Sequence, residues 1–433
     1  MSVEPYRELV FDKEGDGPAG QAGALASLAR QGVGDLIVFA HGWNSSPSGA
    51  TRLCSDFFAP FPELLAPGVE AGYAGLIWPS MMFSGEPAPD YRALVTVLPE
   101  KEQVLDRITD LLVAAAPEET AFARFGALLR ELADVPPGEG GAAGPAARVP
   151  EFLLADPVET CALFTAALDA CGRGGTGRAP EGLRVDLGAY WRGAREALRQ
   201  TTYYLMRQRA GRVGEFGLGP LLGEVARAAP GLRVHLVGHS MGARLVAYAL
   251  KGLPPGARPV ASVTLLQGAF SHYAFAERLP HDPRRSGALW DVRSRVRGPV
   301  VACYSRHDTA LGVMYPLASR LADESASLAA AVGVPGPSPA GVAAGAAAGV
   351  PGAALSGAAR LAGVDDPRWG AIGHDGVRAV PGTAERTLAR VLREGVPGSG
   401  CVSVDAAEVV RSHADICHEE LARVVVSAAG AGR

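Results

Sequence analysis

The sequence lacks the features that would suit a nucleic-acid-binding or membrane-spanning protein. Its 45 acidic residues outnumber its 41 basic ones, the formal net charge is −4 and the isoelectric point lies near 6.2, so no basic field points to nucleic acid. No run of about 20 strongly apolar residues occurs. The amino-terminal stretch also lacks the charged start and apolar run of a secretory signal. We therefore expect a cytoplasmic protein with no transmembrane segment.

Cysteine and lysine are both scarce. The six cysteines form no CxxC pair or other ligand-like cluster, which argues against a zinc site. Cys303 and Cys401 lie in apolar, strand-like runs, and we expect buried thiols there. Three of the 41 basic residues are lysines, a bias that, with the abundant alanine and glycine, suggests a bacterial source of high GC content. We expect no metal and no organic cofactor.

Short apolar runs alternate with helical patterns along the chain. Several of these runs are almost continuously apolar, as expected for strands that helices cover on both faces. The alternation favours an α/β protein with a mostly parallel, doubly wound sheet and right-handed crossovers. Helices are expected between the strands, for example at Leu218–Ala229 and Gly242–Leu250. The expected strands are Tyr6–Phe11, Asp35–Ala40, Ala74–Trp78, Arg233–Val237, Ser262–Gln267, Pro299–Tyr304 and Cys401–Val404.

Between Trp78 and Arg233 a long stretch with few strand signals breaks this rhythm. Residues 101–116 and 121–133 each place apolar side chains along one helical face. Linkers rich in glycine and proline interrupt the stretch. We therefore expect residues 80–182 to form a helical insertion or cap above one edge of the sheet.

The α/β core is then expected to consist of residues 1–79 and 183–433. Within it, residues 187–209 form a longer helical pattern that we assign to the packing of the sheet itself. Residues 329–363 are an Ala/Gly-rich tract of low complexity, for which a flexible loop is favoured over a helical hairpin.

The stretch HLVGHSMGARL (235–245) contains the motif that points to chemistry. An apolar run ends at Gly238, Ser240 lies between two glycines, and an amphipathic helical pattern begins at Gly242. Strand, Gly-x-Ser-x-Gly and helix together form a nucleophile elbow. Larger side chains at the glycines would clash with the neighbouring strand and helix. The turn lifts the serine hydroxyl to a helix amino terminus, which favours negative charge. A tight structural turn is the alternative.

With this elbow, GHSMG, the sequence resembles the α/β-hydrolase superfamily of esterases, lipases and serine peptidases. A second point of resemblance is LIVFAHGWNSS (36–46), an apolar strand that ends in His-Gly-x and is similar to the oxyanion loop of the superfamily. The resemblance implies the α/β-hydrolase fold over the sheet. It also implies an oxyanion hole formed by the backbone N–H groups of Trp43 and Met241, with His41 bracing the loop.

A catalytic triad in this superfamily follows the chain order Ser, Asp or Glu, His. Asp308 lies just past the strand in VVACYSRHDTALGV, where the acid of the superfamily usually lies; a turn-forming or helix-capping aspartate is the alternative. His413 falls in the loop after the last strand, where the superfamily places its base. His418 and His374 stay open as alternatives for the base. His239, inside the elbow, is expected to pack against the sheet.

These residues predict a serine hydrolase that cleaves a carboxylic ester, thioester or amide through an acyl-enzyme on Ser240, with Asp308 orienting His413 as the base. Esterase or lipase chemistry is favoured, and peptidase and thioesterase chemistry stay open. The alternative is a non-catalytic binding or scaffolding protein on the same fold. An epoxide hydrolase or dehalogenase is disfavoured because those enzymes carry a nucleophilic aspartate at the elbow.

The sequence leaves the substrate open, as a small molecule or an acyl group. A cap of helices favours a hydrophobic ester held under apolar side chains. Several large apolar residues flank the region where such a pocket would form, although ordinary core packing explains them as well. These residues are Phe57, Phe58, Trp78, Met81, Met82 and Phe83.

Overall fold

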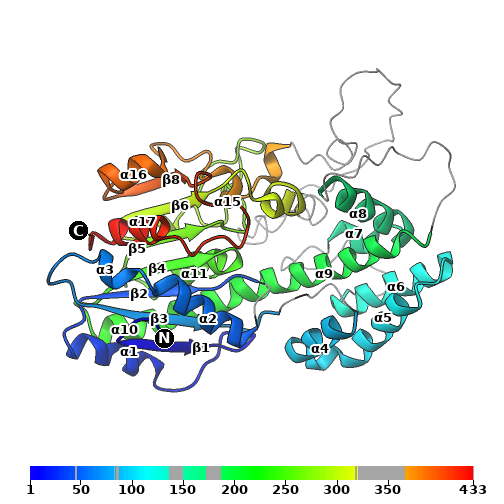
Figure 1. The fold of residues 1–433 in the computed structure, drawn as a ribbon, viewed down its shortest axis with the longest axis horizontal. Coiled ribbons are helices and arrows are strands. Elements are labelled where there is room, and N and C mark those ends of the chain that lie inside the picture. The colour runs from blue at the N-terminus through cyan, green and yellow to red at the C-terminus, as the bar shows by residue number, and fades with distance from the viewer. Residues whose placement is uncertain are drawn as a thin grey trace.

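An eight-stranded sheet forms the centre of the computed structural model (Figure 1). All of its neighbouring strands pair in parallel, so the expected α/β class with a mostly parallel sheet is confirmed. The structure describes residues 1–43, 46–81, 83, 87–135, 150–171, 187–316, 319 and 366–432.

Seven of the strands coincide, within a few residues, with the apolar runs that the sequence predicts. The strands are β1 (Tyr6–Val10), β2 (Asp35–Ala40), β3 (Ala71–Ile77), β4 (Arg233–His239), β5 (Val260–Leu266), β6 (Pro299–Tyr304), β7 (Ala384–Thr387) and β8 (Gly400–Asp405). Their order across the sheet is β1-β3-β2-β4-β5-β6-β8-β7. The sequence does not predict β7, because this edge strand reads AERT and needs no apolar run to pair on one side.

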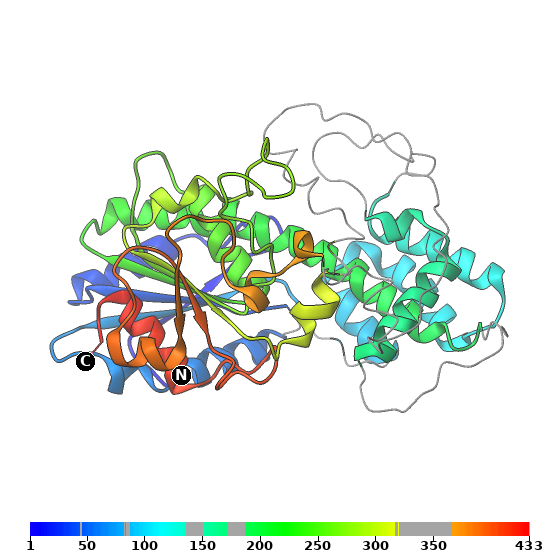
Figure 2. The ribbon, with the colours of Figure 1, turned by 90° about the horizontal axis from the view of Figure 1, so that it is seen from above.

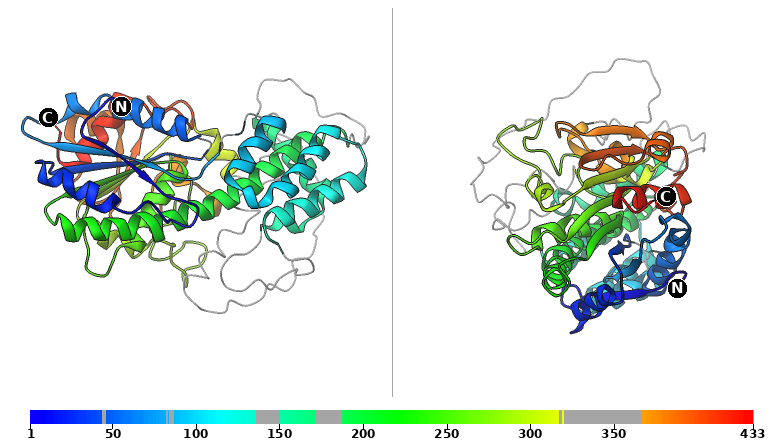
Figure 3. Two further views of the ribbon diagram at one scale, coloured as in Figure 1. Left: turned by 90° about the horizontal axis from the view of Figure 1, so that it is seen from below. Right: turned by 90° about the vertical axis from the view of Figure 1, so that its left-hand side faces the viewer.

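Helices cover both faces of the sheet, and each face has its own hydrophobic core (Figures 1 and 3). Successive residues of β2 enter the two cores in turn, with Leu36 and Val38 in one and Ile37 and Phe39 in the other. The first face is covered by α1 (Gln21–Arg30), α9 (Trp191–Arg212), α10 (Gly219–Ala228) and α11 (Met241–Gly252). The second face is covered by α2 (Pro47–Phe58), α3 (Phe61–Leu64), α16 (Leu388–Glu394) and α17 (Glu419–Ala429).

A group of helices lies beside the sheet and forms a third core (Figure 2). Phe122, Phe125 and Phe164 are fully buried in this core. The helices of the insertion are α4 (Pro87–Val97), α5 (Glu102–Ala114), α6 (Glu119–Leu132), α7 (Glu151–Leu154) and α8 (Pro157–Cys171). The two amphipathic patterns that the sequence predicts in this region correspond to α5 and α6.

Helix α9 connects the insertion to the sheet (Figure 1). In its first turns Trp191 stacks on Phe122, with ring centroids 4.4 Å apart, and Leu198 also lies in the insertion core. Further along, Met206 and Ala210 belong to the core of the sheet. The helix has 22 residues and is therefore about 33 Å long, enough to reach both cores. The prediction that it packs on the sheet is thus right only for its second half.

The remaining elements are short. Helix α15 comprises Ile372–Asp375. Short 3₁₀-helices lie at Pro99–Lys101, Val292–Arg295 and Pro367–Trp369. Short π-helices lie at Val213–Leu218 and Ala310–Met314.

Three further predictions concern burial, membranes and the low-complexity tract. The expected buried thiols are confirmed, since Cys303 and Cys401 are 1% and 2% exposed. Among the described residues, no helix combines the length and the apolar character that crossing a bilayer requires. The cytoplasmic location stays a prediction. The Ala/Gly-rich tract at 329–363 lies outside the described residues.

Candidate active site

The turn between β4 and α11 holds Ser240 in a backbone conformation that residues with a side chain rarely adopt, with φ 57° and ψ −118°. Close contacts require the two glycines around it. A Cβ at Gly238 would lie 2.4 Å from the carbonyl oxygen of Gly242, and a Cβ at Gly242 would lie 2.1 Å from that of Ala40 on β2. The turn has the geometry of a nucleophile elbow and places Ser240 at the carboxyl edge of the sheet.

Ser240, His413 and Asp308 come together although 173 and 105 positions separate His413 from the other two. Nε2 of His413 lies 2.8 Å from Oγ of Ser240, and Nδ1 of His413 lies 2.7 Å from Oδ2 of Asp308. When Nδ1–H donates to the carboxylate, Nε2 is left to accept the proton of the serine hydroxyl. Asp308 is fully buried, whereas the side chain of His413 is 30% exposed, so the base can be reached from solvent.

The loops that carry Asp308 and His413 meet because β6 and β8 are neighbours in the sheet. Asp308 follows β6, and His413 follows β8. The hydroxyl of Ser305 donates to the carbonyl of Val410 at 2.8 Å and so joins the two loops. The second oxygen of Asp308 accepts from the backbone N–H of Leu311 at 3.0 Å. The sequence allows two interpretations of Asp308, as a turn-forming residue and as the partner of a base. One carboxylate oxygen fits each of them, since Oδ1 accepts from the backbone of the turn and Oδ2 faces His413.

A hydrogen bond from His239 holds the loop of His413 in place. Its Nε2–H donates to the carbonyl oxygen of His413 at 2.8 Å. Burial, followed by the neighbouring imidazole of His413, lowers the pKa of His239 to about 3, so this ring is neutral at pH 7. The sequence predicts packing of His239 against the sheet and gives no sign of this bond, which depends on how closely the two loops approach.

The two alternative bases pair with other carboxylates. Nε2 of His418 lies 2.7 Å from Asp415, three residues before it. Nδ1 of His374 lies 2.8 Å from Asp375, and this hydrogen bond raises the pKa of His374. Of the three histidines that the sequence leaves open, the structure therefore places His413 beside Ser240.

The loop after β2 passes directly against Ser240. A Cβ at Gly42 would lie 2.8 Å from Cβ of Ser240, so only glycine fits there. The peptide that joins Gly42 to Trp43 carries the N–H expected in the oxyanion hole. Met241 is the first residue of α11, and its N–H has no acceptor within the helix. Both expected donors therefore belong to segments in contact with Ser240.

His41 is enclosed beneath this loop. Its Nδ1–H donates to the carbonyl of Gly42 at 2.8 Å, and the indole N–H of Trp78 donates to its carbonyl at 3.0 Å. The His41 and Trp78 rings also stack, with centroids 5.7 Å apart. Burial lowers the pKa of His41 to about 4. These contacts support the bracing role that the resemblance implies.

Core packing explains most of the large apolar residues that the sequence places near a pocket. Phe57 and Phe58 lie in the core between the sheet and α2, and Met81 lies in the core of the insertion. Trp78 stacks on His41 and packs in the core on the first face of the sheet. Met82 lies outside the described residues.

Phe83 differs from these residues because it reaches the oxyanion loop. Its ring meets Trp43 edge-on at 5.9 Å, and Tyr203 of α9 meets Trp43 in the same way at 5.5 Å. The guanidinium carbon of Arg199 lies 5.5 Å from the Trp43 ring. We call Trp43, Phe83 and Tyr203 the aromatic wall. The sequence gives no sign of Tyr203, since its part in the wall depends on the path of α9.

A second Ser–His–Asp set, which the sequence does not predict, lies inside the same sheet. Nδ1 of His235 is 2.8 Å from Oγ of Ser262, and its Nε2 is 2.8 Å from Asp35. Arg233 also donates to Asp35 at 2.6 Å. Burial alone would raise the pKa of Asp35, but the hydrogen bonds from His235 and Arg233 outweigh it and lower the pKa. The His235 ring is fully buried, so this set ties β2, β4 and β5 together.

Among the described residues, no group of three or more His, Cys, Asp and Glu side chains could hold a metal ion. Comparison of the chain with protein-family models, with curated proteins and with solved structures gives no match.

Proposed function

We propose that this protein is a serine hydrolase on an α/β-hydrolase fold, which cleaves a carboxylic ester, thioester or amide through an acyl-enzyme on Ser240. Esterase or lipase chemistry is the form we favour. The proposal depends on one observation above all: the hydrogen-bonded chain from Ser240 through His413 to Asp308 begins at a serine in a strained turn and runs through a histidine that is 30% exposed. The order of these residues along the chain, serine, aspartate and then histidine, also supports it.

Each group has a defined part in the proposed reaction. Oγ of Ser240 attacks the substrate carbonyl while Nε2 of His413 takes up the hydroxyl proton. The N–H groups of Trp43 and Met241 stabilise the oxyanion. Asp308 holds the ring orientation and stabilises the imidazolium. His413 then gives its proton to the leaving alcohol, thiol or amine, and the acyl group stays on Ser240.

Hydrolysis of the acyl-enzyme repeats these steps with water. His413 takes a proton from the water, whose oxygen attacks the acyl carbon, and then returns a proton to Oγ of Ser240 as the acid departs. The exposed edge of His413 gives water a route to the base. The proposed reaction needs no group beyond these side chains, the two amides and water.

The aromatic wall supports an apolar acyl group in the substrate. Trp43 belongs both to the wall, through its ring, and to the proposed oxyanion hole, through its backbone N–H. Apolar walls with few polar groups are typical of small-molecule sites. We therefore expect p-nitrophenyl esters to be hydrolysed faster as the acyl chain lengthens from two carbons to eight. Peptide amides in the same assay should be cleaved more slowly than the best ester.

Labelling by a fluorophosphonate probe tests the proposal directly. We expect the folded wild-type protein to be labelled and Ser240→Ala to be unlabelled. Ser294→Ala is the matched control, because Ser294 is exposed and its hydroxyl donates to the carbonyl of the nearby Asp291. Failure of the folded wild-type protein to react would contradict the proposal and favour a non-catalytic binding protein.

A further inference from the structure

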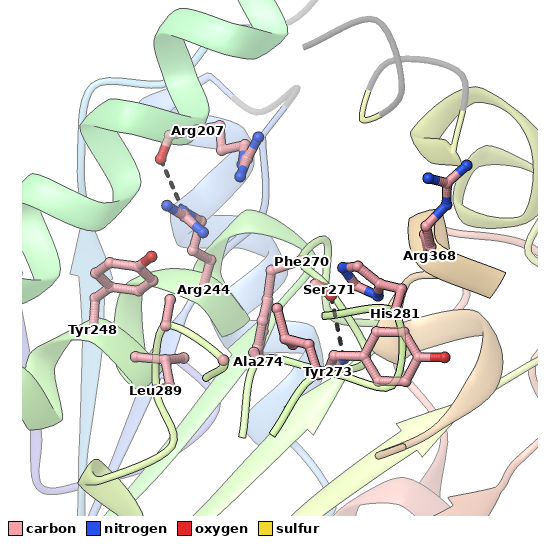
Figure 4. A pocket seen from close by; sticks show the side chains of 13 residues that line it. Arg207, Arg244, Tyr248, Phe270, Ser271, Tyr273, Ala274, His281, Leu289 and Arg368 are labelled. Carbon is pink, nitrogen blue, oxygen red and sulfur yellow. Dashed lines mark hydrogen bonds between the residues drawn. The ribbon is translucent and has the colours of Figure 1, made fainter. Parts of the chain in front are cut away.

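A positively charged pocket lies beside α11, on the face of the sheet that α9 also covers (Figure 4). Arg207 of α9 and Arg244 of α11 stand on one side of it, and His281 and Arg368 stand on the other, with Phe270 between them. No aspartate or glutamate occurs among the described residues that line this pocket. A pocket with several cations and no acid in its lining favours an anionic ligand.

The contacts that hold the Arg244 side chain in place are a hydrogen bond to a backbone carbonyl and a stack on an aromatic ring. Its Nε donates to the backbone carbonyl of Arg207 at 3.1 Å, and its guanidinium carbon lies 4.2 Å from the centre of the Tyr248 ring. Within the described part of the chain, no carboxylate forms an ion pair with Arg244. One edge of the guanidinium is thereby fixed, and its terminal N–H groups keep their capacity to donate to an oxyanion.

The opposite side of the pocket is also positive. Arg368 pairs with Asp366, which offsets part of its charge. The pKa of His281 is nevertheless lowered, first by burial and then by the positive charges of Arg368 and Arg285, against the smaller opposing effect of Asp282 and Asp366. The net field at this side therefore disfavours a further positive charge and favours an anion.

The pocket is connected to the candidate active site through the chain. Ala269 donates its N–H to the carbonyl of Ser240 at 3.1 Å, and Phe270 and Ser271 follow it in the pocket wall. Arg244 lies four residues after Ser240, or about 6 Å along the axis of α11. The partly exposed rings of Tyr248 and Tyr273 also line the pocket, one on the side of Arg244 and the other on the side of His281.

We infer that this pocket binds the phosphoryl group of a small-molecule ligand, with Arg244 as the main donor and the partly exposed Tyr273 ring in contact with the organic part. Arginine forks match phosphate oxygens with paired, charge-assisted hydrogen bonds. The hydroxyl of Ser271 supplies a further polar contact. The inference goes beyond the proposed hydrolase and does not require Ser240 to act as a nucleophile.

Calorimetric titration with inorganic phosphate and with phenyl phosphate, at constant ionic strength, tests this inference. We expect saturable binding, with phenyl phosphate the tighter of the two because its ring contacts the Tyr273 ring of the lining. Equal affinity would assign the pocket to free phosphate and remove the organic part of the ligand. Absence of saturable binding by both compounds would overturn the inference.

Substitution of Arg244 localises the binding. Arg244→Gln should weaken it by about tenfold or more, since it removes a charged hydrogen-bond donor. Arg423→Gln is the matched control, because it removes one positive charge from an exposed side chain of α17, on the other face of the sheet. Equal losses in the two variants would overturn the inference. If Arg244→Gln does not fold, Arg368→Gln replaces it as the test, because the Arg368 side chain is half exposed. This variant should also bind phenyl phosphate more weakly than the wild-type protein.

Ser240→Ala separates this inference from the proposed function. Binding of phenyl phosphate should be unchanged in this variant, whether or not the wild-type protein reacts with a fluorophosphonate. Loss of binding in Ser240→Ala would place the phosphoryl group at the candidate triad and contradict a separate pocket.

Discussion

The sheet carries two Ser–His–Asp sets whose hydrogen bonds are almost equal in length. In the set of Ser240, His413 and Asp308 the contacts are 2.8 and 2.7 Å, and in the set built on His235 both are 2.8 Å. His413 is 30% exposed, whereas His235 is fully buried. Hydrogen-bond geometry alone therefore does not identify an active site.

Backbone setting is the second difference between the two sets. Ser240 lies in a strained turn at the amino end of a helix, with two amide donors on adjoining segments. Ser262 lies within β5, where its N–H and carbonyl groups serve the sheet. Strain and unpaired helix amides are features that the sheet interior cannot offer. Solvent access and backbone setting, more than the three side chains, therefore distinguish the proposed nucleophile Ser240 from the structural Ser262.

The third difference concerns the charge of the acid. Asp35 is already paired with Arg233, so its charge is offset whatever the state of His235. Among the described ion pairs, Asp308 has His413 as its partner. The Asp308 charge therefore acts on the ring that must become positive during the proposed acyl transfer.

Replacement of the two serines should give the largest contrast. Ser240→Ala is expected to lower kcat for p-nitrophenyl ester hydrolysis by at least about 10⁴-fold, because it removes the nucleophile. Ser262→Ala should retain activity within a few fold, since Ser262 is remote from solvent. Steady-state kinetics on both variants checks this, and comparable losses in the two would remove the distinction between the sets.

Replacement of the two acids should separate catalysis from stability. Asp308→Asn is expected to reduce kcat by about 10⁴-fold, since an amide at this position cannot hold the required tautomer or stabilise the imidazolium. Asp35→Asn should leave kcat nearly unchanged and lower the free energy of unfolding by about 2 kcal/mol, because it weakens two charge-assisted hydrogen bonds. Ester kinetics and urea unfolding measure the two effects. A stability loss without a rate loss in Asp308→Asn would assign that residue a structural role.

The loop after β2, with its expected oxyanion donor, belongs to the Ser240 set and offers a third way to test the difference between the two sets. Gly42→Ala places a methyl group 2.8 Å from Cβ of Ser240, so the loop must shift and its N–H donor with it. We expect kcat to fall by about 10²-fold. Gly23→Ala, in α1, is the control, because a Cβ there has nothing within 4 Å. Unchanged kcat in Gly42→Ala would show that the loop contributes no donor.

The smallest expected effect is a pH dependence of stability at the active-site edge. The pKa of His239 is lowered from 6.5 to about 3 in the folded protein, so below pH 6.5 the unfolded chain binds the extra proton. The stability from this ring is therefore complete above pH 6.5 and decreases as the pH falls toward 3. Urea unfolding at pH 7 and pH 5 should show a smaller loss in His239→Gln, which keeps an N–H donor, than in the wild-type protein. An identical loss would mean that His239 titrates normally.

The sequence predicts those parts of the site that short, continuous stretches of the chain encode. The elbow needs a strand, two glycines and a helix in one short stretch, and Asp308 and His413 each follow an apolar strand. The resemblance to the α/β-hydrolase superfamily supplies their order. Because each of these signals is read within about a dozen residues, they can be seen without knowing which strands are neighbours.

The parts that the sequence misses depend on contacts between distant strands. The 200 positions between Asp35 and His235 are bridged only because β2 and β4 pair in one particular register. Tyr203 joins the aromatic wall through the path of a helix that serves two cores. Strand β7 escapes prediction because polar residues suffice at an edge.

The most direct test of an acyl-enzyme on Ser240 is to trap it. Wild-type protein is mixed with a long-chain p-nitrophenyl ester and quenched in acid within one turnover, and its peptides are mapped by mass spectrometry. We predict one adduct of the mass of the acyl group, on the peptide that contains Ser240. Rapid ester hydrolysis with no adduct, or with the acyl group on any other residue, would contradict it.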